Sequence, residues 1–240
     1  MWVVAVLTAL AAVTARVSGT RQERAAGWAV LRAVVQLAGV GLVIATVLRT
    51  PGLAPLYLAL MIAVAAWTSS RRVGGGRAVL AVCAAAIVAG AGTAVGAVLA
   101  GGALPLQART AVPFAAQLIG GSMTATTLAG QRLVDDVVAG WDLVEGRLAL
   151  GATPYRAVRP MARTAAARAL TPALDQTRNV GLVVLPGAYV GLLLAGASPV
   201  QAGQVQLLVL AGLLAAETVS AAVVTRLLAA RLGTRRPETR

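Results

Sequence analysis

Residues 78–103 read AVLAVCAAAIVAGAGTAVGAVLAGGA and contain no charged side chain over 26 positions. A helix needs about 20 apolar residues to cross the roughly 30 Å hydrocarbon core of a bilayer, so this stretch is long enough to span one. The whole chain has the same character: 58% of its 240 residues are hydrophobic and 12% are charged, whereas soluble domains average about 45–50% and about 25%. These proportions predict a membrane protein, because too few charges remain to cover a soluble surface.

Six further apolar segments raise the predicted number of transmembrane helices to about seven. They cover residues 2–17, 28–48, 53–68, 112–128, 172–195 and 204–228. The first is short, but its arginines follow the apolar run instead of preceding it, which is the reverse of a secretory signal peptide. We therefore interpret it as a span. The predicted fold class is all-α, with one polytopic integral membrane domain over residues 1–240.

The arginines predict how this domain is oriented. All 21 basic residues are arginine, and basic residues are enriched in cytoplasmic loops. With the N-terminus outside and the C-terminus inside, only Arg49 and Arg109 fall outside. The other 19 fall in cytoplasmic segments: Arg16, Arg21, Arg24, Arg32, Arg71, Arg72, Arg77, Arg132, Arg147, Arg156, Arg159, Arg163, Arg168, Arg178, Arg226, Arg231, Arg235, Arg236 and Arg240. The net charge of +13 therefore reflects topology, and we expect no nucleic-acid partner.

Residue types that the chain lacks exclude several kinds of chemistry. There is no histidine, which excludes Ser-His-Asp and Cys-His catalysis and most zinc sites. There is no lysine, which an ordinary nucleotide-binding P-loop requires. Cys83 is the single cysteine, so we expect neither a disulfide nor a cysteine-based metal site. The sequence thus predicts no catalytic residue and no cofactor bound by this chain, and it leaves any metal ligands unidentified.

The longest polar stretch is a cytoplasmic segment over residues 129–171. In its first part acidic and apolar residues alternate at three- and four-residue spacing, which predicts an amphipathic helix. We expect this helix to stop at Gly151, and we expect Thr153 and Pro154 to start a second helix as its N-cap and first residue. The second helix carries three basic residues on one face: Arg156, Arg159 and Arg163. Such an elbow over residues 145–163 is suited either to docking a soluble partner or to placing arginines on anionic headgroups at the membrane surface.

The elbow resembles a loop of ABC transporter permeases. Residues 145–154, EGRLALGATP, are similar to the EAA-type loop, in which a Glu precedes a Gly by six positions and a short coupling helix fits a cleft on the ATPase subunit. Gly146 and Arg147 stand where that loop has two alanines, and no Leu-Pro follows at the usual distance.

Further motifs make the chain similar to the iron-export ABC permease family, whose plant relatives are linked to aluminium tolerance. In order, they are AVLRAVVQL at 29–37, SM at 122–123 with Thr126, LGATPYRAVRP at 150–160, TPALDQTRNVGLVVLPG at 171–187 and LAGASP at 194–199. The resemblance implies a permease of a bacterial-type inner or plasma membrane, present in two copies and paired with a soluble ATPase subunit that binds the ATP. It implies a metal ion, iron first, as the cargo. It also implies contact with the ATPase through Glu145, Gly151, Thr153, Pro154, Arg156 and Arg159.

Polar residues and a proline within the predicted spans are candidates for a substrate path or gate. The candidates are Gln36, Asp175, Gln176, Asn179, Pro186, Gly187 and Glu217. Pro186 and Gly187 interrupt the sixth span near its middle, which is typical of transport sites and hinges. The alternative is a kink at which Gly187 and Gly191 form a close helix contact.

The charged candidates also have two interpretations each. Asp175 either lines the cytoplasmic mouth of the path or pairs with Arg178 one turn away. Glu217 lies well inside the last span, where a charge costs roughly 2.5–3.5 kcal/mol. It either contributes to a cation path or proton-linked gate, or it hydrogen bonds to Thr218 and Ser220.

Other functions remain open at this point. One is an ABC permease that carries a sugar nucleotide or another small solute, because the chain lacks the residues of a conventional iron site. Another is a membrane scaffold without transport activity, whose basic faces recruit lipid or a soluble protein.

Overall fold

The computed structural model describes residues 2–20, 23–105 and 107–234 of the chain. They divide into two compact units, Met1–Ala54 and Pro55–Arg240, and each unit is described by itself. Four arginines that contribute to the predicted orientation lie outside the described residues: Arg21, Arg235, Arg236 and Arg240.

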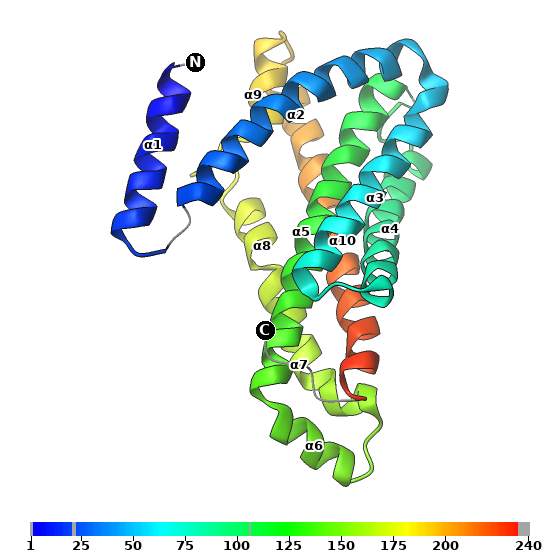
Figure 1. The fold of residues 1–240 in the computed structure, drawn as a ribbon. Coiled ribbons are helices and arrows are strands. Elements are labelled where there is room, and N and C mark those ends of the chain that lie inside the picture. Colours follow the sequence, from blue (N-terminus) through cyan, green and yellow to red (C-terminus); the bar gives the residue numbers. More distant parts are fainter. Residues whose placement is uncertain (1, 21–22, 106, 235–240) are drawn as a thin grey trace. The chain divides into compact units, whose positions relative to one another are not determined.

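The first unit consists of two apolar helices, α1 (Trp2–Val17) and α2 (Glu23–Arg49), followed by the 3-10 turn η1 (Pro51–Leu53). Both helices are drawn in blue in Figure 1. α1 has no buried residue, and large apolar side chains such as Trp2 and Trp28 are exposed. Apolar surface of this extent is typical of a segment that faces lipid or another protein. The two spans predicted in this unit, residues 2–17 and 28–48, are both helical, as expected.

The second unit is built around a bundle of α4 (Arg77–Ala100), α5 (Ala108–Ala139) and α10 (Pro199–Leu232), shown in Figure 1. α3 (Ala54–Val73) is joined to α5 by polar contacts. The Ser69 hydroxyl donates to the Met123 carbonyl at 3.3 Å, and the Thr127 hydroxyl donates to Ser69 at 2.9 Å. α5 has 32 residues and α10 has 34, or about 48 and 51 Å at 1.5 Å per residue. Both helices are longer than the hydrocarbon core of a bilayer.

Three of the described helices are long and apolar enough to cross a membrane: Glu23–Val47, Arg77–Ala100 and Pro199–Leu232. Together with the all-helical structure, they support the predicted polytopic membrane protein. The predicted segments 2–17, 53–68 and 112–128 are also helical, but their helices do not meet the same criterion. The number of spans and their orientation stay predictions.

Two clusters of buried side chains hold the bundle together. One contains Ile87 of α4, Phe114 and Leu118 of α5 and Val209 of α10. The other lies farther along α5 and α10, and it also includes side chains of the two helices that follow α5. The second cluster shows that the segment expected to lie in the cytoplasm is packed onto the same long helices that form the bundle.

The expected amphipathic helix in residues 131–148 is not a separate element. α5 continues through it as far as Ala139, and Gly140 caps its end before α6 (Trp141–Ala149) begins. The spacing of buried apolar residues along α5 continues past residue 128, where the predicted span ends. Leu133 and Val137 are fully buried in the second cluster described above. The chain therefore breaks at Gly140, inside the stretch for which the sequence predicts one helix that stops at Gly151.

The elbow that follows has the predicted helix boundaries. Gly151 has a φ of +84°, a left-handed conformation that glycine adopts without a steric cost. The Thr153 side chain caps α7 (Pro154–Ala169) by accepting a hydrogen bond from the Arg156 backbone N–H, and Pro154 occupies the first turn. The sequence signals for this turn are thus confirmed.

The interrupted span predicted over residues 172–195 is interrupted in the structure, over a longer stretch than expected. The chain forms α8 (Thr171–Arg178) and α9 (Gly187–Leu194) with eight non-helical residues between them. The break at Pro186 and Gly187 is present, since Pro186 caps α9. It begins earlier than expected, because the Asn179 carbonyl accepts hydrogen bonds from Leu182, Val183 and Val184, and because Gly181 has a φ of +80°. This local turn ends α8 at Arg178, and Asn179 is the C-cap residue.

Candidate functional site

A cavity of about 430 Å³ lies between the α8–α9 connection and α10. Its polar side chains are those of Tyr189 and Gln206. Gln206 is only 5% exposed, and its Oε1 atom has no hydrogen-bond partner among the described residues. A buried polar atom without a partner costs about 1–3 kcal/mol, so this oxygen favours the binding of a hydrogen-bond donor in the cavity. The full lining is Val180, Gly181, Leu185, Pro186, Tyr189, Gly203, Gln206, Leu207 and Leu210.

The backbone of the α8–α9 connection adds further acceptors next to this cavity. The Asn179 and Val184 carbonyls are used within the turn, whereas the carbonyls of residues 180–182 bond no described donor. Non-helical backbone at membrane depth is tolerated where it is buried in protein or lines a cavity. Discontinuous helices of this kind form the substrate sites of many transporters.

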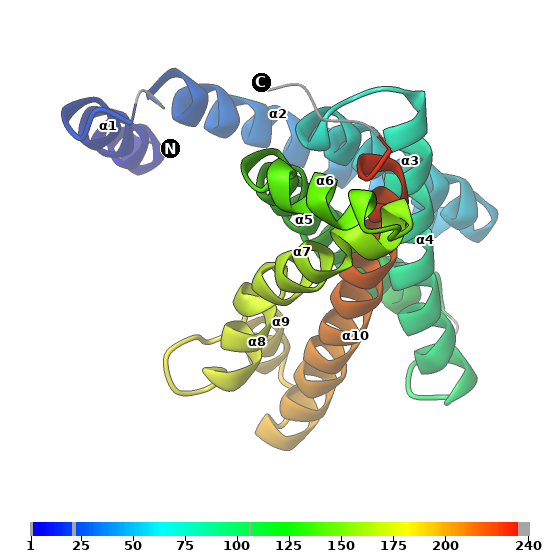
Figure 2. The same cartoon turned by 90° about the horizontal axis from the view of Figure 1, so that it is seen from below.

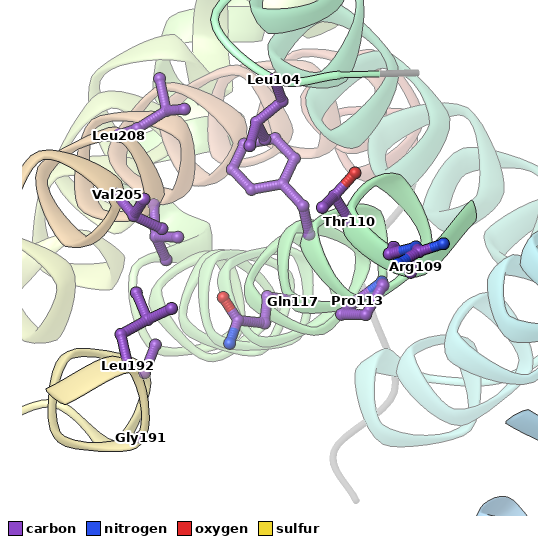
Figure 3. Close-up of a pocket in the computed structure, with 12 residues that line it drawn as sticks. Leu104, Arg109, Thr110, Pro113, Gln117, Gly191, Leu192, Val205 and Leu208 are labelled. Carbon is purple, nitrogen blue, oxygen red and sulfur yellow. The ribbon is translucent and has the colours of Figure 1, made fainter. Parts of the chain in front are cut away.

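A second cavity, of about 340 Å³, lies between α5, α9 and α10. Its wall is mainly apolar, with Arg109, Thr110 and Gln117 as the polar side chains. Figure 3 shows Gln117 projecting from α5 into the space bordered by Leu192 of α9, with Arg109 and Thr110 near the start of α5. Different residues of α9 line the two cavities, Ala188 and Leu192 in one and Tyr189 in the other. α9 has no buried residue, so it is loosely held beside two cavities.

The structure brings only part of the predicted substrate path together. Pro186 lines the larger cavity with Gln206. Asp175, Gln176 and Asn179 are exposed on or just after α8, outside both cavities. Gln36 is an exposed residue of α2 in the first unit.

Two of the alternative interpretations are not supported. No described atom lies within 4 Å of the position that a Cβ would take at Gly187 or Gly191, so these glycines make no close helix contact within the described chain. Asp175 and Arg178 do not form an ion pair. Among the described residues, Asp136 and Arg168 form one, at 3.9 Å.

Glu217 is half-buried on α10 and lies against α5. Its Oε1 atom is 2.8 Å from the position that a Cβ would take at Gly121, so the absence of a side chain there makes room for the carboxylate. The expected hydrogen bonds are not made. The Thr218 hydroxyl donates to the Leu214 carbonyl at 2.6 Å, and the Ser220 hydroxyl donates to the Ala86 carbonyl at 3.1 Å. Glu217 thus has no side-chain partner among the described residues.

Buried hydroxyls surround the same level of the bundle. Ser122, Thr126 and Ser220 are each 0% exposed, and the side-chain oxygens of Ser122 and Thr126 bond no described group. Together with Glu217 they form a polar layer between α4, α5 and α10, although the structure contains no group of three or more His, Cys, Asp or Glu side chains among its described residues.

Gln206 was not identified from the sequence. It lies in an apolar helix among other glutamines, at Gln201 and Gln204, and nothing local distinguishes it from them. Its position around the helix does distinguish it, because Gln206 lies three residues from Gly203 and four from Leu210, which places all three on one side of the helix. Which side of α10 borders a cavity is known only once the helices that pack against α10 are known. The spacing of residues in the sequence alone therefore does not identify Gln206.

The α6–α7 elbow forms a tip at one end of the second unit (Figure 1). Glu145, Gly151, Thr153 and Arg156 are exposed on it. Below the exposed side, Val144 and Val158 are fully buried, and the Arg147 guanidinium donates to the Ala157 carbonyl at 2.8 Å. The elbow is thus packed firmly on its inner side, and its outer surface carries polar side chains together with the exposed Leu143 and Leu150. Figure 2 shows it from below, beside the ends of α5 and α10.

The tip is in direct contact with the end of α10. A Cβ at Gly233 would meet the backbone of Pro154, with the Pro154 Cα at 2.7 Å. α7 also packs along both α5 and α10, and its fully buried Ala157 and Ala165 belong to the same cluster as Leu133 and Val224. Because a close-packed contact transmits displacement, a force on the tip would act on α10 and α5. Arg159 lies farther along α7, beside a third cavity considered below.

Residues 1–232 match the model of "Uncharacterised protein family (UPF0014)". The rice protein "UPF0014 membrane protein STAR2" is 35% identical over 228 residues, which is 92% of this chain and 79% of that protein. "Protein ALUMINUM SENSITIVE 3" of Arabidopsis thaliana is 33% identical, over 83% of this chain and 74% of that protein.

A bacterial relative has a name that states a function. "Probable iron export permease protein FetB" of Escherichia coli is 31% identical, over 80% of this chain and 75% of that protein. No solved structure matches the chain. The matches agree with the resemblance found in the motifs at residues 145–200.

Proposed function

The chain belongs to the UPF0014 family of membrane proteins, and we propose that it is the transmembrane subunit of an ABC transporter, driven by a separate ATPase. The exposed tip between α6 and α7 is the ATPase docking surface. Glu145, Gly151, Thr153, Pro154 and Arg156 form it, with Arg159 at its edge. The chain binds no nucleotide itself, and the ATP binds to the partner.

The observation that carries this proposal is the close packing of the tip on the long helices. A docking element can drive transport only if its movement reaches the membrane part. Here Pro154 contacts the end of α10 at Gly233, and α10 then borders both cavities beside α9. ATP binding closes the ATPase pair, the tip moves with it, and α10 changes the access of the cavities from one membrane face to the other.

The complex contains two permease chains and two ATPase subunits in the inner or plasma membrane of a bacterial-type cell. Large apolar side chains of the α8–α9 connection support a second copy or lipid as their neighbour, since Leu182 and Val183 are more than 80% exposed. The orientation has the N-terminus outside and the C-terminus and tip inside, as the arginines predict.

The cargo is a metal ion such as iron, in line with the name of the Escherichia coli relative. It passes the half-buried Glu217, the polar layer around Ser122 and the cavity at Gln206. The remaining path and gate positions are Gln36, Asp175, Gln176, Asn179, Pro186 and Gly187. The second candidate is a sugar nucleotide or another small solute, carried by the same ATP-driven mechanism. The mainly neutral walls of both cavities favour an uncharged solute, because an unpaired buried charge is costly.

Transport in reconstituted vesicles tests the proposal. The permease and its ATPase are placed in lipid vesicles with the ATPase facing outward, Fe²⁺ and ATP are added outside, and ATP-dependent uptake of the ion is followed. We expect Glu217→Gln to lower the rate at least tenfold without weakening ATPase binding, because it removes the negative charge within the bundle. Thr218→Val is the control, since the exposed Thr218 side chain bonds only its own helix. Equal rates for wild type and Glu217→Gln would remove Glu217 from the path, and ATP-driven uptake of an organic solute alone would change the cargo.

A further inference from the structure

A third cavity, of about 260 Å³, lies between α7 and α10 and is lined by three arginines. Arg159 and Arg163 come from α7, and Arg226 comes from α10. Their neighbours in the wall are small or uncharged: Tyr155, Ala162, Ala166, Ala222 and Thr225. No carboxylate lines the cavity, and none of the three arginines forms an ion pair with a described residue. Three positive charges therefore share one concave site, and no described residue supplies a counter-charge.

The site is held in place by packing. The Arg226 guanidinium lies 5.7 Å from the centre of the Tyr155 ring, within the range of a cation–π interaction. Ala157, Val158 and Ala165 of α7 are fully buried against the bundle, so the α7 arginines rise from a fixed backbone. The small side chains of Ala162, Ala166 and Ala222 leave the space between the guanidinium groups open. Guanidinium groups bind phosphate oxygens through paired hydrogen bonds.

The depth of the cavity determines which phosphates can reach it. Arg226 lies 27 residues after the first residue of α10, about 40 Å along the helix axis. A bilayer measures about 40–45 Å with its headgroup regions. In the orientation proposed above, on which this step rests, the three arginines lie at the headgroup level of the cytoplasmic leaflet. That leaflet carries anionic lipids.

We propose that Arg159, Arg163 and Arg226 form a binding site for a phosphate group at the cytoplasmic membrane surface, as carried by the headgroup of an acidic phospholipid. The bound headgroup joins α7 to α10 at the root of the tip. This function is distinct from ATPase docking, which uses the outer side of the elbow and shares with the phosphate site only Arg159, at its edge.

Native mass spectrometry of the delipidated permease tests the site. The probes are short-chain phosphatidylglycerol, short-chain phosphatidylcholine and inorganic phosphate, each titrated against wild type and Arg159→Gln/Arg163→Gln. We expect phosphatidylglycerol to bind wild type at least tenfold more tightly than phosphatidylcholine does, and the double variant to lose this preference. Arg156→Gln is the matched control, since it removes the same charge from an exposed position of the same helix that does not line the cavity. Ala222→Leu, which fills the cavity without changing charge, should also weaken phosphatidylglycerol binding.

The possible outcomes distinguish a lipid phosphate from a soluble phosphate, and they include results that would overturn the proposal. Inorganic phosphate that displaces phosphatidylglycerol at equal concentration would assign the site to a soluble phosphate. Binding that is unchanged in both the double variant and Ala222→Leu would overturn the proposal. So would a double variant that binds lipid normally but no longer binds the ATPase, because the arginines would then belong to the docking surface. Lipid binding needs no ATPase and no cargo, so its result is independent of the transport experiment.

Discussion

Gly90 of α4 lies against both α5 and α10. A Cβ at this position would overlap the Ser220 hydroxyl and the Ala216 carbonyl of α10, and it would lie 3.1 Å from the Ser122 hydroxyl of α5. Close helix approach at small residues is a general means of packing helices in membranes. The polar layer beside Glu217 therefore depends on one missing side chain.

Substitution of Gly90 measures this dependence. We expect Gly90→Ala to destabilise the protein by about 1–3 kcal/mol through overpacking, seen as a lower Tm in detergent. Gly92→Ala is the control on the same helix, because no described atom lies within 4 Å of its Cβ position, and it should be neutral or slightly stabilising. A Tm for Gly90→Ala equal to that of Gly92→Ala would show that the helices are not close-packed here.

At the level of elements, the sequence predicts helices more reliably than it predicts their ends. Apolar runs such as residues 78–103 were placed correctly, and Gly151 and Thr153 mark the elbow because their conformations are locally determined. The end of α5 was misplaced, since the burial of Leu133 and Val137 depends on α7 and α10. The break between α8 and α9 is longer than predicted. Its length depends on hydrogen bonds to the Asn179 carbonyl as well as on Pro186. Gln206 and the arginine cavity require knowledge of which helices are neighbours.

The orientation of the elements can be tested at two loop positions. Ala103 follows α4 and Leu150 lies on the elbow, and both are exposed. In a background with Cys83→Ala, which removes the buried thiol, each position is changed to cysteine and treated with a membrane-impermeant maleimide. We expect Ala103→Cys to react in intact cells and Leu150→Cys to react only after lysis. Labelling of Leu150→Cys in intact cells would reverse the proposed orientation.

For the whole molecule, the arrangement of the second unit connects a rigid tip, two long helices and a broken helix in one packed body. The tip contacts the end of α10, and α10 borders the cavities beside α9. α9 is the loosely held part, with no buried residue, and is therefore the element that we expect to move most easily. This distribution of rigid and loose parts is what a subunit driven from outside the membrane requires.

The measurement that tests the central claim most directly is the rate of ATP hydrolysis by the purified ATPase in lipid vesicles, with and without this chain. We predict that the chain changes the rate severalfold and that Glu145→Arg on the exposed tip abolishes the change, because it replaces the one acidic side chain assigned to the docking surface with a basic one. Arg178→Gln, an exposed change far from the tip, should leave the effect intact. An ATPase whose rate is the same with wild type, with Glu145→Arg and without the chain would contradict the account.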